Sequence, residues 1–105
     1  MINLNNFRTY QLAKVLYKEC QKLNLRGEMK DQLQRASLSI CLNLAEGSAR
    51  KSKNDRIRFF NIALASSKEV YAILDILNYV KLKSIADQIA AMSYKLILAQ
   101  TGPGS

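Results

Sequence analysis

The chain contains no histidine, no tryptophan and only one proline among its 105 residues. The missing histidine removes the commonest general base, the commonest metal ligand and the usual switch near neutral pH. Of the four glycines, two flank Pro103, so few turn residues remain for the many turns of a β-sandwich or barrel. The composition therefore predicts an all-α, non-enzymatic protein that carries no metal and no cofactor.

Cysteines and long apolar runs are also scarce. Cys20 and Cys41 lie too far apart for a CxxC zinc motif, and both fall in apolar segments, which predicts buried free thiols. The longest uncharged helical stretch covers residues 36–45, whereas a membrane span needs about twenty apolar residues. With no signal-peptide pattern visible, we expect a soluble cytoplasmic domain over residues 1–100, a disordered tail over residues 101–105 and no membrane partner.

Apolar residues recur at intervals of three and four in the first half of the chain, as one face of an α-helix requires. The pattern predicts a first helix over residues 7–23. A second helix is expected to begin near Glu28 and Asp31, because acidic side chains favour a helix N-terminus. It is expected to end at Gly47, because glycine readily adopts the left-handed conformation that closes many helices.

The second half of the chain predicts two further helices. Ser52 and Asp55 have the spacing of a capping box, which predicts that the third helix begins just after Ser52. Ser84 and Asp87 repeat that spacing and predict a fourth helix that runs to about residue 100. The short connections favour an antiparallel up-down-up-down four-helix bundle. The last two helices carry more apolar residues than one such core can hold, which favours a homo-oligomer. The residues in question are Ile73, Leu77, Met92 and Ile97.

Positive charge is concentrated in the first half of the chain. Residues 1–58 contain twelve basic and five acidic side chains, net +7 of the total +8. The basic residues cluster between the second and third helices and follow one side of the first, which predicts an anion-binding surface, whereas for any single residue the alternative is a solvated face. The candidate nucleic-acid-binding residues are Arg8, Lys14, Lys18, Lys22, Arg50, Lys51, Lys53, Arg56 and Arg58. Tyr10 and Tyr17 would either stack on unpaired bases or join the core.

A polar stripe follows one side of the second helix at intervals of three and four. Two interpretations stay open for it: a solvated face, or a partly buried hydrogen-bond network that reaches the third helix and fixes the register of the two helices. The predicted network comprises Arg35, Ser39, Asn43, Glu46, Ser66 and Glu69.

The same stretch carries a family resemblance. Residues 31–50, reading DQLQRASLSICLNLAEGSAR, resemble the signature of the bacterial four-helix bundle proteins encoded by intervening sequences in large-subunit ribosomal RNA genes. Residues 7–13 and 63–69 are similar to other parts of that family. The resemblance implies a ring-shaped homo-oligomer, commonly a pentamer. It also implies a distant similarity to the accessory variability proteins of diversity-generating retroelements, which act with nucleic acid and a reverse transcriptase.

These observations lead to two main hypotheses about function. The first is a non-enzymatic, oligomeric bundle that binds nucleic acid, structured RNA in preference to DNA, mainly through phosphate contacts. The alternative is a protein-interaction scaffold that docks an acidic partner, such as a reverse transcriptase or a nuclease. An enzyme built on Glu46 and Glu69 is the least favoured reading, because no nucleophile with an adjacent base and no phosphate-binding glycine loop accompanies them.

Overall fold

A computed structural model describes residues 3–102 of the protein. This part of the chain folds as all-α, as predicted, with a short 3-10 turn η1 (Leu4–Asn6) and four helices: α1 (Arg8–Gln21), α2 (Gly27–Ala49), α3 (Lys53–Ile76) and α4 (Val80–Thr101). Of the expected tail, Thr101 is the last residue of α4 and Gly102 follows it as the cap, while residues 103–105 lie outside the described residues.

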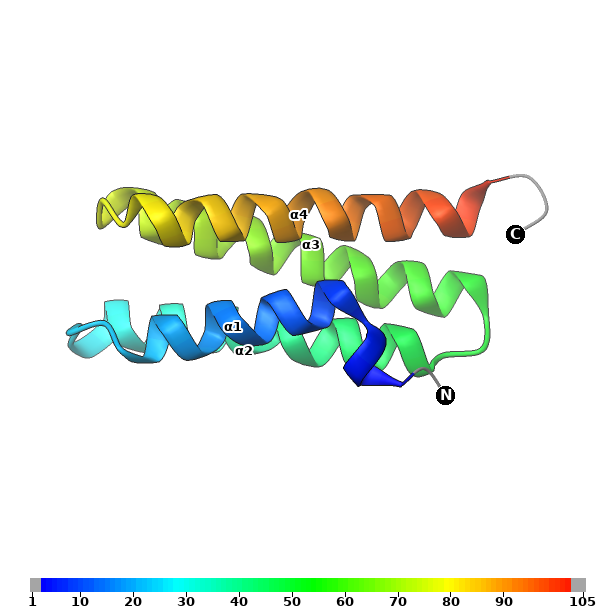
Figure 1. Ribbon diagram of the computed structural model, residues 1–105, viewed down its shortest axis with the longest axis horizontal. Coiled ribbons are helices and arrows are strands. Elements are labelled where there is room, and N and C mark those ends of the chain that lie inside the picture. The colour runs from blue at the N-terminus through cyan, green and yellow to red at the C-terminus, as the bar shows by residue number, and fades with distance from the viewer. Residues whose placement is uncertain (1–2, 103–105) are drawn as a thin grey trace.

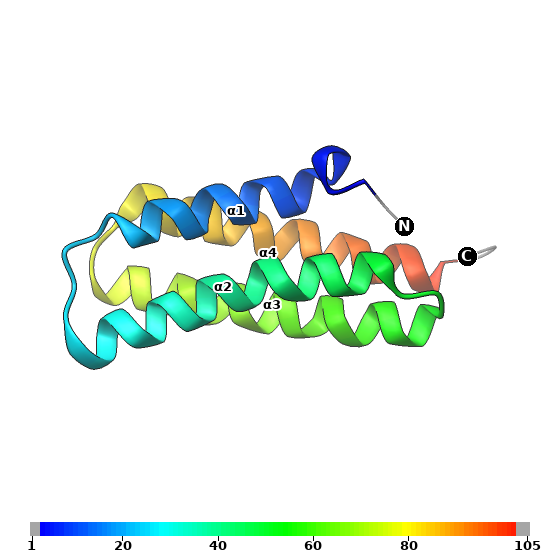
Figure 2. The same ribbon diagram turned by 90° about the horizontal axis from the view of Figure 1, so that it is seen from below.

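The four helices lie side by side along the long axis of a molecule that measures 46 × 21 × 21 Å (Figure 1). α1 packs against α2 and α4, and α3 packs against the same two helices. Figures 1 and 2 show that the connection between α2 and α3 lies at one end of the molecule, together with the C-terminal end of α4. The connections between α1 and α2 and between α3 and α4 lie at the opposite end.

A single apolar core runs between the helices. Its largest fully enclosed apolar side chains are Leu16, Leu33, Ile40, Leu44, Val70, Leu74 and Ile89. The four residues expected to form an apolar surplus are not the exposed ones. Ile73 is in the core, Leu77 and Ile97 pack against it, and Met92 is half-buried. The exposed apolar side chains are others, chiefly Leu42, Ile76 and Val80, which are 58%, 67% and 69% exposed.

The prediction that the second helix ends at Gly47 is wrong. Gly47 lies inside α2 and is buried. A Cβ atom at this position would lie 2.6 Å from Cε1 of Phe60 and 3.2 Å from Cβ of Phe59. The absence of a side chain therefore serves the close packing of α3 against α2, and the left-handed conformation is not required here.

The fourth helix begins earlier than Ser84, the predicted start. Asn78 has a φ of 64° and closes α3, with its N–H donating to the carbonyl of Asp75 and the N–H of Tyr79 donating to the carbonyl of Leu74. This pair of bonds is the Schellman arrangement, in which asparagine replaces the more usual glycine. The chain can therefore start α4 at Val80, and Ser84 lies within it. The predicted start of α3 is confirmed, since Oγ of Ser52 accepts a 3.1 Å hydrogen bond from the N–H of Asp55.

Candidate nucleic-acid interface

The chain reverses direction between α2 and α3 within three residues, 50–52. We call the five basic residues around this reversal the basic corner: Arg50, Lys51, Lys53, Arg56 and Arg58. Arg50 leaves α2 in an extended conformation, and Ser52 then caps α3. The basic corner thus stands at one end of the molecule, where the backbone turns back on itself (Figure 2).

Arg56 holds the basic corner together. Its Nη1 donates hydrogen bonds to the carbonyl oxygens of Arg50 and Lys51, at 3.1 and 2.7 Å. Its Nε donates at 2.7 Å to Oε1 of Gln100, near the end of α4. These three contacts tie the half-buried Arg56 to the backbone of the reversal and to α4, so we assign it a positioning contact. Its predicted contact with nucleic acid stays a prediction.

Arg50 and Arg58 share one aromatic ring. Their guanidinium carbons lie 4.8 and 4.7 Å from the centroid of the Phe59 ring, within the range of a cation–π contact. The missing side chain at Gly47 allows Phe59 to lie this close to α2, because a Cβ atom there would be 3.2 Å from Cβ of Phe59. Phe59 was not among the site residues predicted from the sequence, although its position directly after Arg58 was an available signal.

Carboxylates restrain both of these arginines. Glu46 accepts a hydrogen bond from Arg50 at 3.0 Å, and Asp55 lies 3.9 Å from Arg58. Lys51 and Lys53 are exposed and have no ion pair or hydrogen bond from their side chains within residues 3–102. The basic corner therefore combines two oriented guanidinium groups with two free ammonium groups.

The basic residues of the first helix do not join the basic corner in one cluster. They are spread along the molecule, with Arg8 at the start of α1 and Lys22 directly after its end, near the opposite end of the molecule (Figure 1). Lys22 pairs with Glu19 at 2.5 Å, and Nζ of Lys14 lies 5.8 Å from the centroid of the Tyr10 ring. Lys18 is exposed. Tyr10 and Tyr17 are half-buried against the core, so the core interpretation of these two residues holds.

The predicted polar network forms in its central part. Ser39 and Ser66 share a hydrogen bond of 2.9 Å between their hydroxyl groups, and Nδ2 of Asn43 donates to Oγ of Ser39 at 3.1 Å. Glu46 instead pairs with Arg50. Arg35 and Glu69 are exposed, and their side chains have no hydrogen bond or ion pair in the described part of the chain. The contact thus links α2 to α3 through two hydroxyls, without buried charge.

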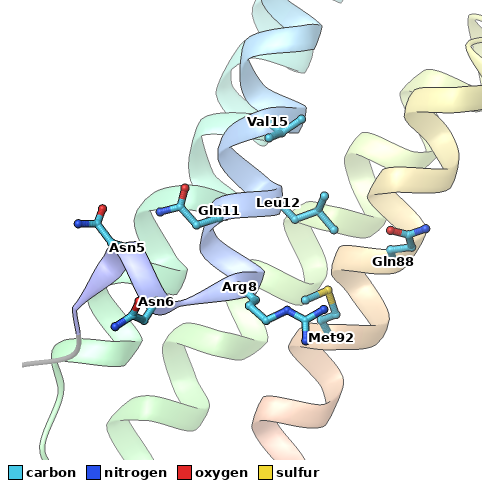
Figure 3. A pocket seen from close by; sticks show the side chains of 8 residues that line it. All are labelled: Asn5, Asn6, Arg8, Gln11, Leu12, Val15, Gln88 and Met92. Atoms are coloured by element: carbon cyan, nitrogen blue, oxygen red, sulfur yellow. The ribbon is translucent and has the colours of Figure 1, made fainter.

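A groove of about 680 Å³ lies between the start of α1 and α4 (Figure 3). Polar side chains of Asn5, Asn6, Gln11 and Gln88 line it together with Leu12, Val15 and Met92, and Arg8 reaches across toward α4. Among the described residues that line this groove, Arg8 alone is charged. The groove therefore offers one cation and several amides, without a nucleophile or a general base.

Both cysteines are buried free thiols, as predicted. Burial raises the pKa of Cys20 to about 12 and the pKa of Cys41 to about 11 from the usual value of 9.0, because a thiolate is poorly solvated there. Such thiols are unreactive at neutral pH. Residues 3–102 hold no group of three or more cysteine and acidic side chains placed to bind a metal ion.

The fold and the basic corner together define a small basic four-helix protein. Comparison with known families matches residues 6–97 to the 23S rRNA-intervening sequence protein family, and the chain belongs to that family. The resemblance inferred from residues 31–50 is thereby confirmed. Neither the curated proteins nor the solved structures include a significant match. None of the helices in residues 3–102 combines the length and hydropathy that a membrane crossing requires.

Proposed function

We propose that this protein is a non-enzymatic RNA-binding bundle that contacts the phosphate backbone of structured RNA through the basic corner. The observation that carries the proposal is the exposed cluster of Arg50, Lys51, Lys53 and Arg58 on a backbone that Arg56 fixes from within. The name of the family, which refers to a ribosomal RNA intervening sequence, supports RNA in preference to DNA.

Electrostatics favours this reading. Each positive side chain that neutralises a phosphate releases condensed counterions, so several clustered cations give useful affinity without base-specific contacts. The acidic side chains near the basic corner are fewer than the basic ones and are already paired with Arg50 and Arg58. The non-enzymatic assignment is supported by Glu46, which is held by Arg50, and by the exposed position of Glu69.

The proposal includes assembly of an up-down-up-down bundle into a ring-shaped homo-oligomer, a pentamer, in the cytoplasm. Its support is the set of apolar side chains that the core does not use. Leu38 and Leu42, one turn apart on α2, are 37% and 58% exposed, and Tyr94 and Leu98 on α4 are 53% and 48% exposed. A ring would repeat the basic corner around its axis, and multivalency would strengthen contacts that are weak singly.

The experiment is a filter-binding series against salt with a folded RNA. The corner variant changes Arg50, Lys51, Lys53 and Arg58 to Gln. The matched control removes the same number of charges along the first helix by changing Arg8, Lys14, Lys18 and Lys22 to Gln. For the corner variant we expect the slope of log K against log salt to become shallower by about 3, whereas the control stays close to the wild type.

Equal losses of RNA affinity and of salt slope in the two variants would show that only net charge matters and would contradict the proposed site. A wild-type affinity that does not change with salt would contradict phosphate binding altogether. Recovery of an acidic protein partner that survives nuclease treatment, together with no RNA affinity, would favour the scaffold function instead.

A further inference from the structure

We propose that the basic corner holds an unpaired nucleotide of the RNA, whose base stacks on the guanidinium plane of Arg50 or Arg58. The inference rests on the proposed RNA binding and deepens it. It adds a stacking contact, which phosphate attraction alone does not give. Such a contact would select single-stranded or looped segments over a continuous duplex.

The first argument is the orientation of the two guanidinium groups. Each lies within 4.8 Å of the centroid of the same Phe59 ring, and each has a carboxylate partner, Glu46 for Arg50 and Asp55 for Arg58. A planar guanidinium that contacts both a ring and a carboxylate has fewer accessible orientations than an unpaired side chain. The ordering cost of binding is therefore reduced at this position.

The second argument is access. The Arg50 and Arg58 side chains are 43% and 63% exposed despite their contacts with Phe59 and the carboxylates, so part of each group stays open to a ligand. Guanidinium planes stack readily on nucleobases, and a stacking contact tolerates any base because every base has a π-face. Lys51 and Lys53, exposed on the same corner, supply charge for the flanking phosphates.

The third argument is shape. The basic corner is a tight reversal at the end of a narrow bundle, not a long flat face (Figures 1 and 2). An A-form duplex buries its base faces within the helix, and its major groove is too deep and narrow for side chains to read. Loops, bulges and free ends instead expose base faces, which a protruding corner can reach.

The test keeps the charge constant and removes the planar guanidinium groups. The variant R50K/R58K retains both positive charges, and the control K51R/K53R retains charge at the neighbouring positions. Fluorescence anisotropy compares each protein on a single-stranded RNA and on a duplex of the same length. We expect R50K/R58K to lose about tenfold in affinity for the single strand, to bind the duplex within about twofold of the wild type, and to keep the salt slope.

A second variant, F59L, keeps an apolar side chain but removes the ring, and a circular dichroism melt checks that it folds. We expect it to lose single-strand affinity in the same direction as R50K/R58K. Unchanged single-strand binding by R50K/R58K would overturn the stacking proposal while leaving phosphate binding intact. Failure of the wild type to bind either RNA would overturn the proposed function as well, so the two failures are distinguishable.

Discussion

Replacement of Gly47 by alanine puts one methyl group into the tightest contact between α2 and α3. The added Cβ would lie 2.6 Å from Cε1 and 2.8 Å from Cδ1 of Phe60, and 3.2 Å from Cβ of Phe59. Carbon atoms pack without strain at about 3.5–4.0 Å, so the ring or the helix has to move by roughly 1 Å. Phe60 is only 3% exposed, which leaves its ring little room to move.

Two opposing free-energy changes decide the outcome. Forcing an extra methyl group into a packed core typically costs about 1–3 kcal/mol. Replacing glycine by alanine inside a helix stabilises the helix by about 1 kcal/mol. We therefore expect G47A to lower the free energy of unfolding by about 1 kcal/mol, which corresponds to a fall in Tm of about 4–8 °C for a domain of this size.

The assay is urea unfolding followed by circular dichroism at one fixed protein concentration. The exposed residue Ala65 in α3 provides the control, because A65G reports the helix propensity difference without a packing contribution. The double variant G47A/F60L replaces the ring by a smaller side chain, so its loss of unfolding free energy should be smaller than the sum of the two single losses. If G47A stabilises the protein by as much as A65G destabilises it, the steric reasoning is refuted.

Three further predictions follow from single contacts. R56A removes the bonds that close the basic corner and should lower the free energy of unfolding in urea by about 1–2 kcal/mol. RNA binding should weaken as well, because Arg56 positions the backbone of the basic corner; unchanged stability and binding would argue against the positioning role. N78A should lower the free energy of unfolding by about 1 kcal/mol, because alanine avoids the left-handed conformation, whereas N78G should leave it unchanged. Equal stabilities of the two variants would contradict the assigned helix end. The pKa values of Cys20 and Cys41 in the folded protein lie above 9.0, so the contribution of the two thiols to stability is complete below pH 9 and is lost toward pH 11–12. In C20A/C41A the free energy of unfolding in urea should therefore fall less steeply over that pH range. An unchanged pH profile would argue against burial of the thiols.

The sequence predicted local features correctly where the signal and its cause lie close together in the chain. Ser52 caps α3 because its hydroxyl needs only a donor three residues away. The fold class and the burial of the two cysteines followed from composition and periodicity. These features depend on backbone geometry and on local polarity, both of which a single sequence displays directly.

Features that depend on distant parts of the chain were missed. Gly47 was interpreted as a helix end because the local rule for glycine is strong, whereas its actual constraint is an aromatic ring on another helix. Arg56 was grouped with its basic neighbours because one of its partners, Gln100, is 44 residues away and the other two are backbone carbonyls that no sequence pattern marks. The predicted polar network was right for Ser39 and Ser66, which share a hydrogen bond, and wrong for Arg35 and Glu69, which stay in solvent. No pattern in one sequence tells which members of the stripe face the neighbouring helix.

The position of the RNA on the protein tests the central claim most directly. Ultraviolet cross-linking of a bound, partly single-stranded RNA, followed by mass spectrometry of the digested protein, reports which residues touch bases. We predict that the adducts fall within residues 50–59, on or beside Phe59, and that they diminish in R50K/R58K. Adducts confined to the first helix or to the groove between α1 and α4 would contradict the claim that the basic corner is the RNA-binding site.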